Sequence, residues 1–232
     1  VALSATGKTS RVDGPKEQTN TYTREAFARQ MVFGSDIDGD GYPEIVTIDH
    51  SAPLPSPTTV VRFAYDPVSK KLVERERFEV PLPANQRFVA LAPLGDLDGD
   101  GFADVAVVRL LPHALVSGPG GGTNSYQTGL EIVTLFGSAA GWSRTAKMQI
   151  PFSAEERTFE NAPVFVRGVG DVDGDGIPDI AVGLQTSNPD SCLPARRGRV
   201  EIRKGSPGAT FDVVLATHQD LFDPAPLGDV NG

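Results

Sequence analysis

An acidic loop that occurs three times constrains the folding of this chain more than any other feature. Each copy begins with Asp-x-Asp-Gly-Asp-Gly and ends in an acid at its ninth position, at residues 36–44, 96–104 and 171–179. A fourth copy begins at Gly228 with Asp229 and Asn231, and the sequence ends inside it. Hard divalent cations prefer oxygen ligands, and alternating carboxylates on a glycine-rich turn place several oxygens around one point. The loop is therefore a candidate calcium site, and its repetition predicts a repeat architecture.

The acids at positions 1, 3 and 5 of each loop alternate with residues that point away, so three side chains converge. Glycines at positions 4 and 6 permit the positive φ that such a tight curve needs. The acid at position 9 completes the carboxylate set, and the residue at position 7 can contribute its carbonyl. The candidate ligands are Asp36, Asp38, Asp40, Tyr42 and Glu44; Asp96, Asp98, Asp100, Phe102 and Asp104; and Asp171, Asp173, Asp175, Ile177 and Asp179.

Two other interpretations of the loop fail. An EF-hand shares the opening acids and the glycine at position 6, but it requires a bidentate Glu at position 12 and flanking helices. Position 12 is Thr47, Val107 or Val182, and the residues after each loop are apolar and β-branched without a helical period. A merely solvated turn explains Asp-Gly, but it does not explain four acids at the same offsets in every complete copy.

The spacing of the loops predicts one supersecondary block per repeat. The first acids stand at 36, 96, 171 and 229, so the spacings are 60, 75 and 58 residues. Each block has a short apolar stretch (29–33, 88–92, 164–168), the loop, a buried strand (44–48, 104–108, 179–183) and a hairpin. Four strands per block, with the metal loop between the first two, predict an all-β fold, a β-propeller of four-stranded blades.

The expected blades are residues 29–81, 87–151 and 163–216, with 1–28 as the end of a preceding blade and 225–232 as the start of a further one. Because both ends fall inside repeats, we expect a partial propeller that belongs to a larger chain or assembly. The long second spacing is explained by an insertion at residues 112–129, which we expect to be a surface loop.

The charge of the chain is largely explained by the loops. The formal charge is −9, from 30 acids against 21 Lys and Arg. Three calcium ions would leave about −3, so the acidity is mostly explained by metal and says little about partners. We expect no nucleic-acid partner. Nothing in the sequence is long and apolar enough to span a membrane. Such loops fill where calcium is millimolar, so we expect a secreted, periplasmic or cell-surface location. Cys192 is the only cysteine, so an internal disulfide is excluded for this stretch.

The loops, the glycine before three of them (Gly95, Gly170 and Gly228) and the phrase LFGSAAGW at residues 135–142 resemble the FG-GAP repeats of integrin α subunits and their bacterial relatives. The resemblance implies a propeller, usually of seven blades, with calcium between strands one and two on the face away from the usual ligand side. It also implies the loop ligands named above. Glu44 departs from the usual Asp at position 9, and Asn231 is a neutral oxygen donor beside Asp229 in the truncated loop.

The family does not fix one function, since it includes adhesion receptors, secreted lyases and esterases, and scaffolds. The leading hypothesis is a non-catalytic, calcium-stabilised module for recognition, adhesion or structure, which binds a protein or glycan through loops that hold no metal. One alternative is a propeller domain of a secreted hydrolase or polysaccharide lyase, in which His50 and His113 would meet at one mouth. Another is a scaffold subunit of a cell-envelope assembly, with broad apolar patches. Because local catalytic motifs are missing, we predict no catalytic residue.

Overall fold

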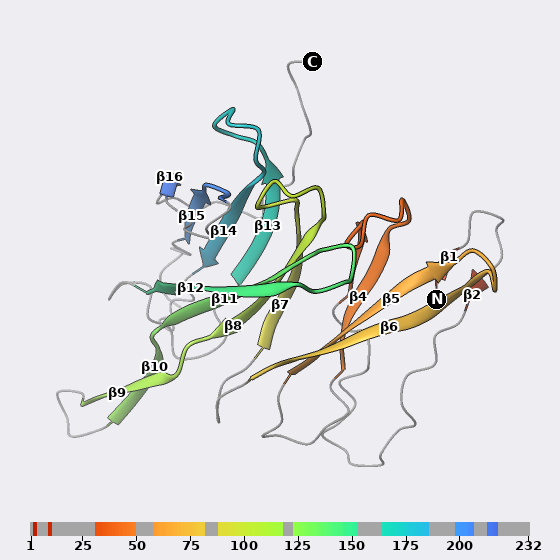
Figure 1. Cartoon of the computed structure of the whole chain (residues 1–232). Helices are drawn as coiled ribbons and strands as arrows, with labels where there is room; N and C mark the ends of the chain where they lie inside the picture. Colours follow the sequence, from red (N-terminus) through yellow and green to blue (C-terminus); the bar gives the residue numbers. More distant parts are fainter. Residues whose placement is uncertain are drawn as a thin grey trace, which may run out of the picture.

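A computed structural model describes residues 2–3, 9–10, 31–49, 58–81, 88–117, 123–152, 164–185, 198–206 and 213–217. Every regular element in these ranges is a β-strand. The strands form three four-stranded antiparallel sheets and two short hairpins (Figure 1). The prediction of an all-β fold is therefore confirmed.

In each large sheet, the strands are hydrogen-bonded in the order in which the chain makes them, as in a meander. The first sheet contains β3 (Met31–Ser35), β4 (Glu44–Asp49), β5 (Thr58–Asp66) and β6 (Lys71–Val80). The second contains β7 (Phe88–Gly95), β8 (Asp104–Leu110), β11 (Gly129–Phe136) and β12 (Arg144–Pro151). The third contains β13 (Val164–Gly170), β14 (Asp179–Gln185), β15 (Gly198–Arg203) and β16 (Val213–Thr217).

Two hairpins complete the described strands. Near the N-terminus, β1 (Ala2–Leu3) pairs with β2 (Thr9–Ser10). Between β8 and β11, β9 (His113–Ser117) pairs with β10 (Thr123–Gln127). The insertion that the sequence led us to expect as a surface loop therefore contains a β-hairpin. Alternating β-prone residues on both sides of a glycine-rich segment explain this difference.

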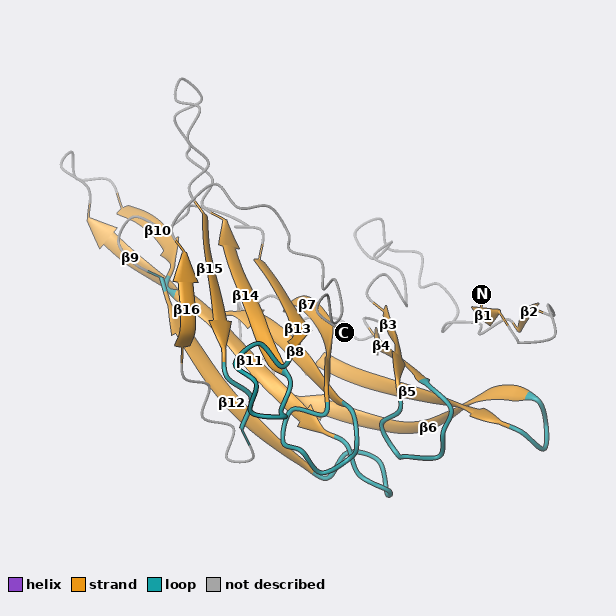
Figure 2. Ribbon diagram, turned by 90° about the horizontal axis from the view of Figure 1, so that it is seen from above, coloured by secondary structure: helices purple, strands orange, loops and turns teal. Residues whose placement is uncertain are grey.

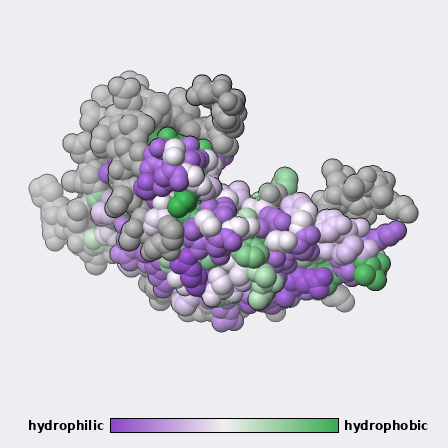
Figure 3. Space-filling model, turned by 45° about the horizontal axis from the view of Figure 1, so that its top comes forward, coloured by the Kyte–Doolittle hydropathy of each residue, from purple (hydrophilic) through white to green (hydrophobic). Residues whose placement is uncertain are grey.

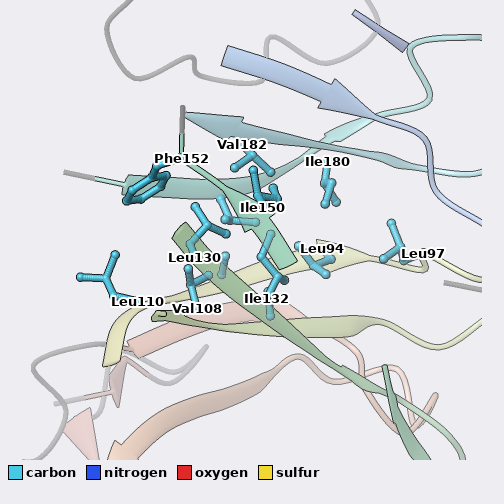
Figure 4. Packing of buried hydrophobic residues seen from close by; sticks show 13 residues of the cluster. Leu94, Leu97, Val108, Leu110, Leu130, Ile132, Ile150, Phe152, Ile180 and Val182 are labelled. Atoms are coloured by element: carbon cyan, nitrogen blue, oxygen red, sulfur yellow. The ribbon is translucent and has the colours of Figure 1, made fainter. Parts of the chain in front are cut away.

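The second sheet is buried on both faces because it lies between the other two. Along β8 and β11, successive side chains point to opposite sides, and both strands are buried throughout. One face joins a cluster with the first sheet, and its members are Val105, Val107, Val133 and Leu135 with Val32, Val46, Val60 and Val80. The other face packs on the third sheet, with Val108, Leu130, Ile132 and Ile150 against Val166, Ile180 and Val182 (Figure 4).

The first strands of the sheets lie next to one another, since β7 packs against both β3 and β13. The fourth strands lie at the outer edge. Every second side chain of β12 is exposed along most of its length, and β6 carries charged residues at its exposed positions 74, 75 and 77, which discourages edge pairing with other chains. The face shown in Figure 3 is mainly hydrophilic, with isolated hydrophobic side chains. In the described part of the chain, no helix has the length and apolar character needed to cross a membrane.

Candidate metal centres in the acidic loops

Each acidic loop joins the first strand of a sheet to the second and is entered through a β-bulge. The bulge falls at the same register in all three sheets, where Ser35, Gly95 and Gly170 lie opposite the ninth-position acids Glu44, Asp104 and Asp179. The three loops are neighbours on one side of the molecule (Figure 2). The repeated sequence thus produces a repeated local structure.

The first-position carboxylate curls each loop by accepting hydrogen bonds from its own backbone. Asp36 accepts from the amides of Gly39 and Gly41 at 2.8 and 3.0 Å. Asp96 accepts from the amides of Asp100 and Gly101, and Asp171 accepts from those of residues 174–176, at 2.7–3.0 Å. The φ angles of the position-4 glycines lie between 72° and 79°, a region that side chains disfavour. The alternation of Asp and Gly is therefore what allows the chain to fold around the acids.

The ninth-position acid is a buried anchor. Asp104 is fully buried, and its two oxygens accept from the Leu97 amide at 2.8 Å and the Gly137 amide at 3.0 Å. Asp179 accepts in the same way from Val172 at 2.8 Å and Gly205 at 3.0 Å. These bonds tie the loop to the end of the third strand. Glu44 keeps the first bond, from Ile37 at 2.7 Å, but its other oxygen receives a hydrogen bond from Arg62.

Burial opposes the ionisation of two of the ninth-position acids, Asp104 and Glu44. Burial raises the pKa of Asp104 to about 7, and the charges of Asp98 and Asp100 add to the rise against the lowering effect of the two amides. Burial also raises the pKa of Glu44, where the Ile37 amide and Arg62 oppose the shift and Asp38 supports it. A cation placed among these carboxylates would favour their ionised form.

A basic side chain reaches the third-position acid in every loop. Arg62 donates to Asp38 Oδ2 at 2.6 Å, Arg144 forms an ion pair with Asp98, and Lys204 lies 2.8 Å from Asp173 Oδ2. Their exposures differ. The Arg62 side chain is 6% exposed, against 44% for Arg144 and 39% for Lys204. The basic side chains at the second and third loops are therefore partly exposed to solvent, whereas the one at the first loop is buried.

The structure brings most of the predicted acids together. Three groups have carboxylate oxygens within 4.8 Å of one another, namely Asp36, Asp38, Asp40 and Glu44; Asp96, Asp98 and Asp104; and Asp171, Asp173 and Asp179. Asp100 and Asp175 fall outside these groups, and each accepts from the amide of its own position-7 residue, Phe102 or Ile177, as Asp40 does from Tyr42. Asp229 and Asn231 lie outside the described residues.

The donor set of the second loop fits a hard divalent cation. Its converging groups are carboxylates, the ligand type that such ions prefer. Asp98 is buried, yet its Oδ1 has no hydrogen-bond partner, a condition that a bound ion would remedy. The third loop has the same arrangement in a more exposed setting, with Asp173 22% exposed. In the first loop the guanidinium of Arg62 already occupies part of the acidic cluster.

Adjacent loops are in direct contact. The Ala103 amide donates to the Asp36 carbonyl at 2.9 Å, and the Ser138 amide donates to the Ile37 carbonyl at 3.1 Å. The ring of Phe102 lies so close to Gly39 that a β-carbon there would stand 2.8 Å from it. The loops therefore form one continuous layer rather than three isolated turns.

Sequence reasoning missed the basic partners and two glycines. Arg62 lies in the third strand β5, Arg144 begins the fourth strand β12, and Lys204 directly follows the third strand β15, so all three are far from the loops in sequence. A β-carbon on Gly137 or Gly205 would stand 2.5 or 2.1 Å from a backbone carbonyl oxygen of the loop in its own sheet. Strand pairing is the signal that could have found them, because it places the end of the third strand beside the loop. The hydrolase hypothesis placed His50 and His113 at one mouth. His113 begins β9, but His50 lies outside the described residues, so the structure does not place the two side by side.

The fold and the loops define an all-β repeat protein with acidic loops between its first and second strands, and the comparisons specify the kind. Residues 36–107 match the FG-GAP-like repeat family. The chain is similar to integrin alpha-IIb from Homo sapiens, with 29% identity over 139 residues, which cover 59% of this chain and 11% of the integrin. Both comparisons support the resemblance to integrin-α-like FG-GAP repeats that the sequence predicted. The aligned stretch spans about a tenth of the integrin's length.

Proposed function

We propose that this chain is a calcium-stabilised propeller segment that serves as a recognition or adhesion module outside the cytoplasm. Its similarity to an integrin α subunit supports the adhesion role. The acidic loops support the metal, because buried and unpartnered carboxylate oxygens at converging positions favour a divalent cation. A location outside the cytoplasm is proposed because loops of this kind fill where calcium is millimolar.

The observation that carries the proposal is the geometry of the second loop. Asp98 and Asp104 are 9% and 0% exposed, and Asp96 brings a third carboxylate within reach. Carboxylates held this close and shielded from water repel one another, and a bound cation would offset that repulsion in addition to the ion pair between Arg144 and Asp98. These three acids would hold the ion, with Asp171, Asp173 and Asp179 as their counterparts in the third loop. When bound, calcium supplies the charge that neutralises the loop and links the first strand to the second.

The three large sheets are proposed to be consecutive blades, at residues 29–81, 87–151 and 163–216. Support comes from the face-to-face packing of the sheets and from the contacts of β7 with β3 and β13, since the first strands of propeller blades surround a common axis. Residues 1–28 and 225–232 would belong to neighbouring blades of a larger propeller.

The ligand is proposed to be a protein or a glycan bound away from the metal loops. The acidic loops are occupied by their own hydrogen bonds and by contacts with the adjacent loop, so they act in stability rather than recognition. The functions of a hydrolase or polysaccharide lyase domain and of an envelope scaffold stay hypotheses.

The metal part of the proposal is tested by thermal unfolding of metal-stripped protein with and without millimolar calcium. Calcium should raise the melting temperature of the wild type, because a ligand that binds only the folded state stabilises it. Asp98→Asn should reduce that rise, and Ser69→Ala, on the exposed β5–β6 turn, should leave the rise unchanged. An equal rise in wild type and Asp98→Asn would contradict the assignment of the second loop.

The recognition part is tested by binding of the calcium-loaded chain to a glycan array and to immobilised extracellular proteins. The proposal expects saturable binding to at least one class of ligand that heat-denatured chain does not show. Glycoside or polysaccharide cleavage by the purified chain, instead of stable binding, would favour the hydrolase or lyase hypothesis.

A further inference from the structure

The buried side chain of Arg62 sets the first acidic loop apart from the other two. Its Nη1 donates to Asp38 Oδ2 at 2.6 Å and to Glu44 Oε1 at 3.2 Å, and its Nε lies 3.6 Å from Glu76 Oε2. The guanidinium is therefore held between the third-position and ninth-position acids of the loop. These are two of the residues that would otherwise bind a metal ion.

The register of the sheets shows that this cation is specific to the first loop. Val46, Ala106 and Ala181 each stand ten residues after the first Asp of their loop. Their partners on the third strand are Arg62, Thr134 and Ile202. The same structural position thus carries a basic side chain in the first sheet and a neutral one in the second and third. The second and third sheets therefore serve as internal references for the first sheet.

The ninth position changes together with Arg62. Asp104 and Asp179 each use their second oxygen to accept from the amide of a glycine that follows the third strand. Tyr65 stands at the corresponding place in the first sheet, inside β5, and Glu44 directs its second oxygen to Arg62. The longer side chain and the guanidinium together replace the bond that glycine provides elsewhere.

The acids alone would rank the first loop as the best metal site, because four of its carboxylates converge against three in each of the others. Asp38 Oδ1 also lacks a hydrogen-bond partner, as Asp98 Oδ1 does, so oxygen supply does not separate the loops. The burial of the basic side chain does distinguish the first loop from the other two. Arg144 and Lys204 are exposed enough to turn into solvent when an ion arrives. Arg62 is buried, so a divalent ion beside it would face a like charge that has no route to water.

We propose that Arg62 takes the place of a metal ion in the first loop, which is thus closed by an internal guanidinium while the second and third loops are closed by calcium. Charge-assisted hydrogen bonds to Asp38 and Glu44 tie β5 to the loop, and an ion pair with Glu76 ties it to β6. The inference rests on the proposed function, because it assigns calcium to two of the three described loops. Under this assignment the first sheet keeps its loop closed when calcium is withdrawn.

The test compares matched variants at the first position of two loops. Asp36→Asn and Asp96→Asn disturb the same turn, since both acids accept two backbone amides. Bound calcium is measured by equilibrium dialysis and metal analysis, and the melting temperature is measured with and without calcium. We expect Asp96→Asn to bind one calcium fewer than wild type and to lose part of its calcium-dependent rise in melting temperature. Asp36→Asn should bind as much calcium as wild type.

Loss of one calcium in both variants would overturn the role of Arg62 and leave the proposed function standing. Wild-type protein without bound calcium would instead overturn the proposed function. Arg62→Thr provides the converse test, since it gives the first sheet the residue found at this register in the second. It should bind one calcium more than wild type, and an unchanged number would contradict the inference. If Arg62→Thr does not fold, the comparison of Asp36→Asn with Asp96→Asn still decides.

Discussion

The raised pKa of Asp104 predicts that the stability of the metal-free chain falls as pH rises from about 4 to about 7. The folded pKa is about 7 and the ordinary value is 3.8, so the folded state binds the proton more tightly. A group of this kind contributes stability below its unfolded pKa, and that contribution is lost as pH rises through the folded pKa. Between pH 5 and 7.5, Asp104 should therefore cost the metal-free protein about 2–3 kcal/mol of unfolding free energy.

The assay is urea unfolding of metal-stripped protein at pH 5 and pH 7.5, for wild type and for Asp104→Asn, which does not titrate. Subtracting the variant removes the contributions of histidines and other groups. The wild type should lose about 2–3 kcal/mol more than the variant over this interval. With saturating calcium the sign should reverse, because the ion requires ionised carboxylates. Equal pH dependence of the two metal-free proteins would refute the reasoning.

Two further predictions concern the second sheet. Gly137→Ala should destabilise the chain by about 1–3 kcal/mol in urea unfolding, because the added β-carbon meets backbone oxygens at 2.5 and 2.7 Å. As a control, Ala139→Ser at an exposed position should change the free energy of unfolding by less than about 0.5 kcal/mol. Equal effects of the two substitutions would contradict the contact argument. Arg109 and Glu131 form a buried ion pair whose side chains are 7% and 6% exposed. Glu131→Leu should therefore cost about 3–5 kcal/mol by leaving Arg109 buried without its partner, and adding Arg109→Met should restore most of the loss in the same measurement. A double variant no more stable than the single one would show that the buried charge is not the cause.

Local chemistry accounts for what the sequence could predict. Asp and Gly at fixed offsets specify a curled loop, and β-branched residues after it specify a buried strand, so the loops and the strands beside them follow from short segments. The first-position acids behave as this reasoning expects, since each accepts amides from its own loop. The convergence of most of the acids follows from the same local curvature.

Long-range pairing accounts for what the sequence could not predict. Arg62 lies 24 residues from Asp38, and only the register between β4 and β5 places it against the loop. The need for glycine at position 137 arises from the carbonyl oxygens of Ala103 and Ile37, which only the folded structure brings next to it. Asp100 looked equivalent to Asp98 by spacing, yet it turns to the Phe102 amide. The linear pattern therefore predicts which residues form a loop, and the fold decides which of them face its centre.

The central claim is that the second and third acidic loops hold calcium, and its most direct test is metal analysis of a double variant. Wild type and Asp96→Asn/Asp171→Asn are stripped of metal, dialysed against millimolar calcium, and compared for calcium bound per chain. Each substitution removes one carboxylate from a converging group. We predict that the double variant binds two calcium ions fewer than wild type. The same amount of bound calcium in both proteins would contradict the assignment of these loops as metal sites.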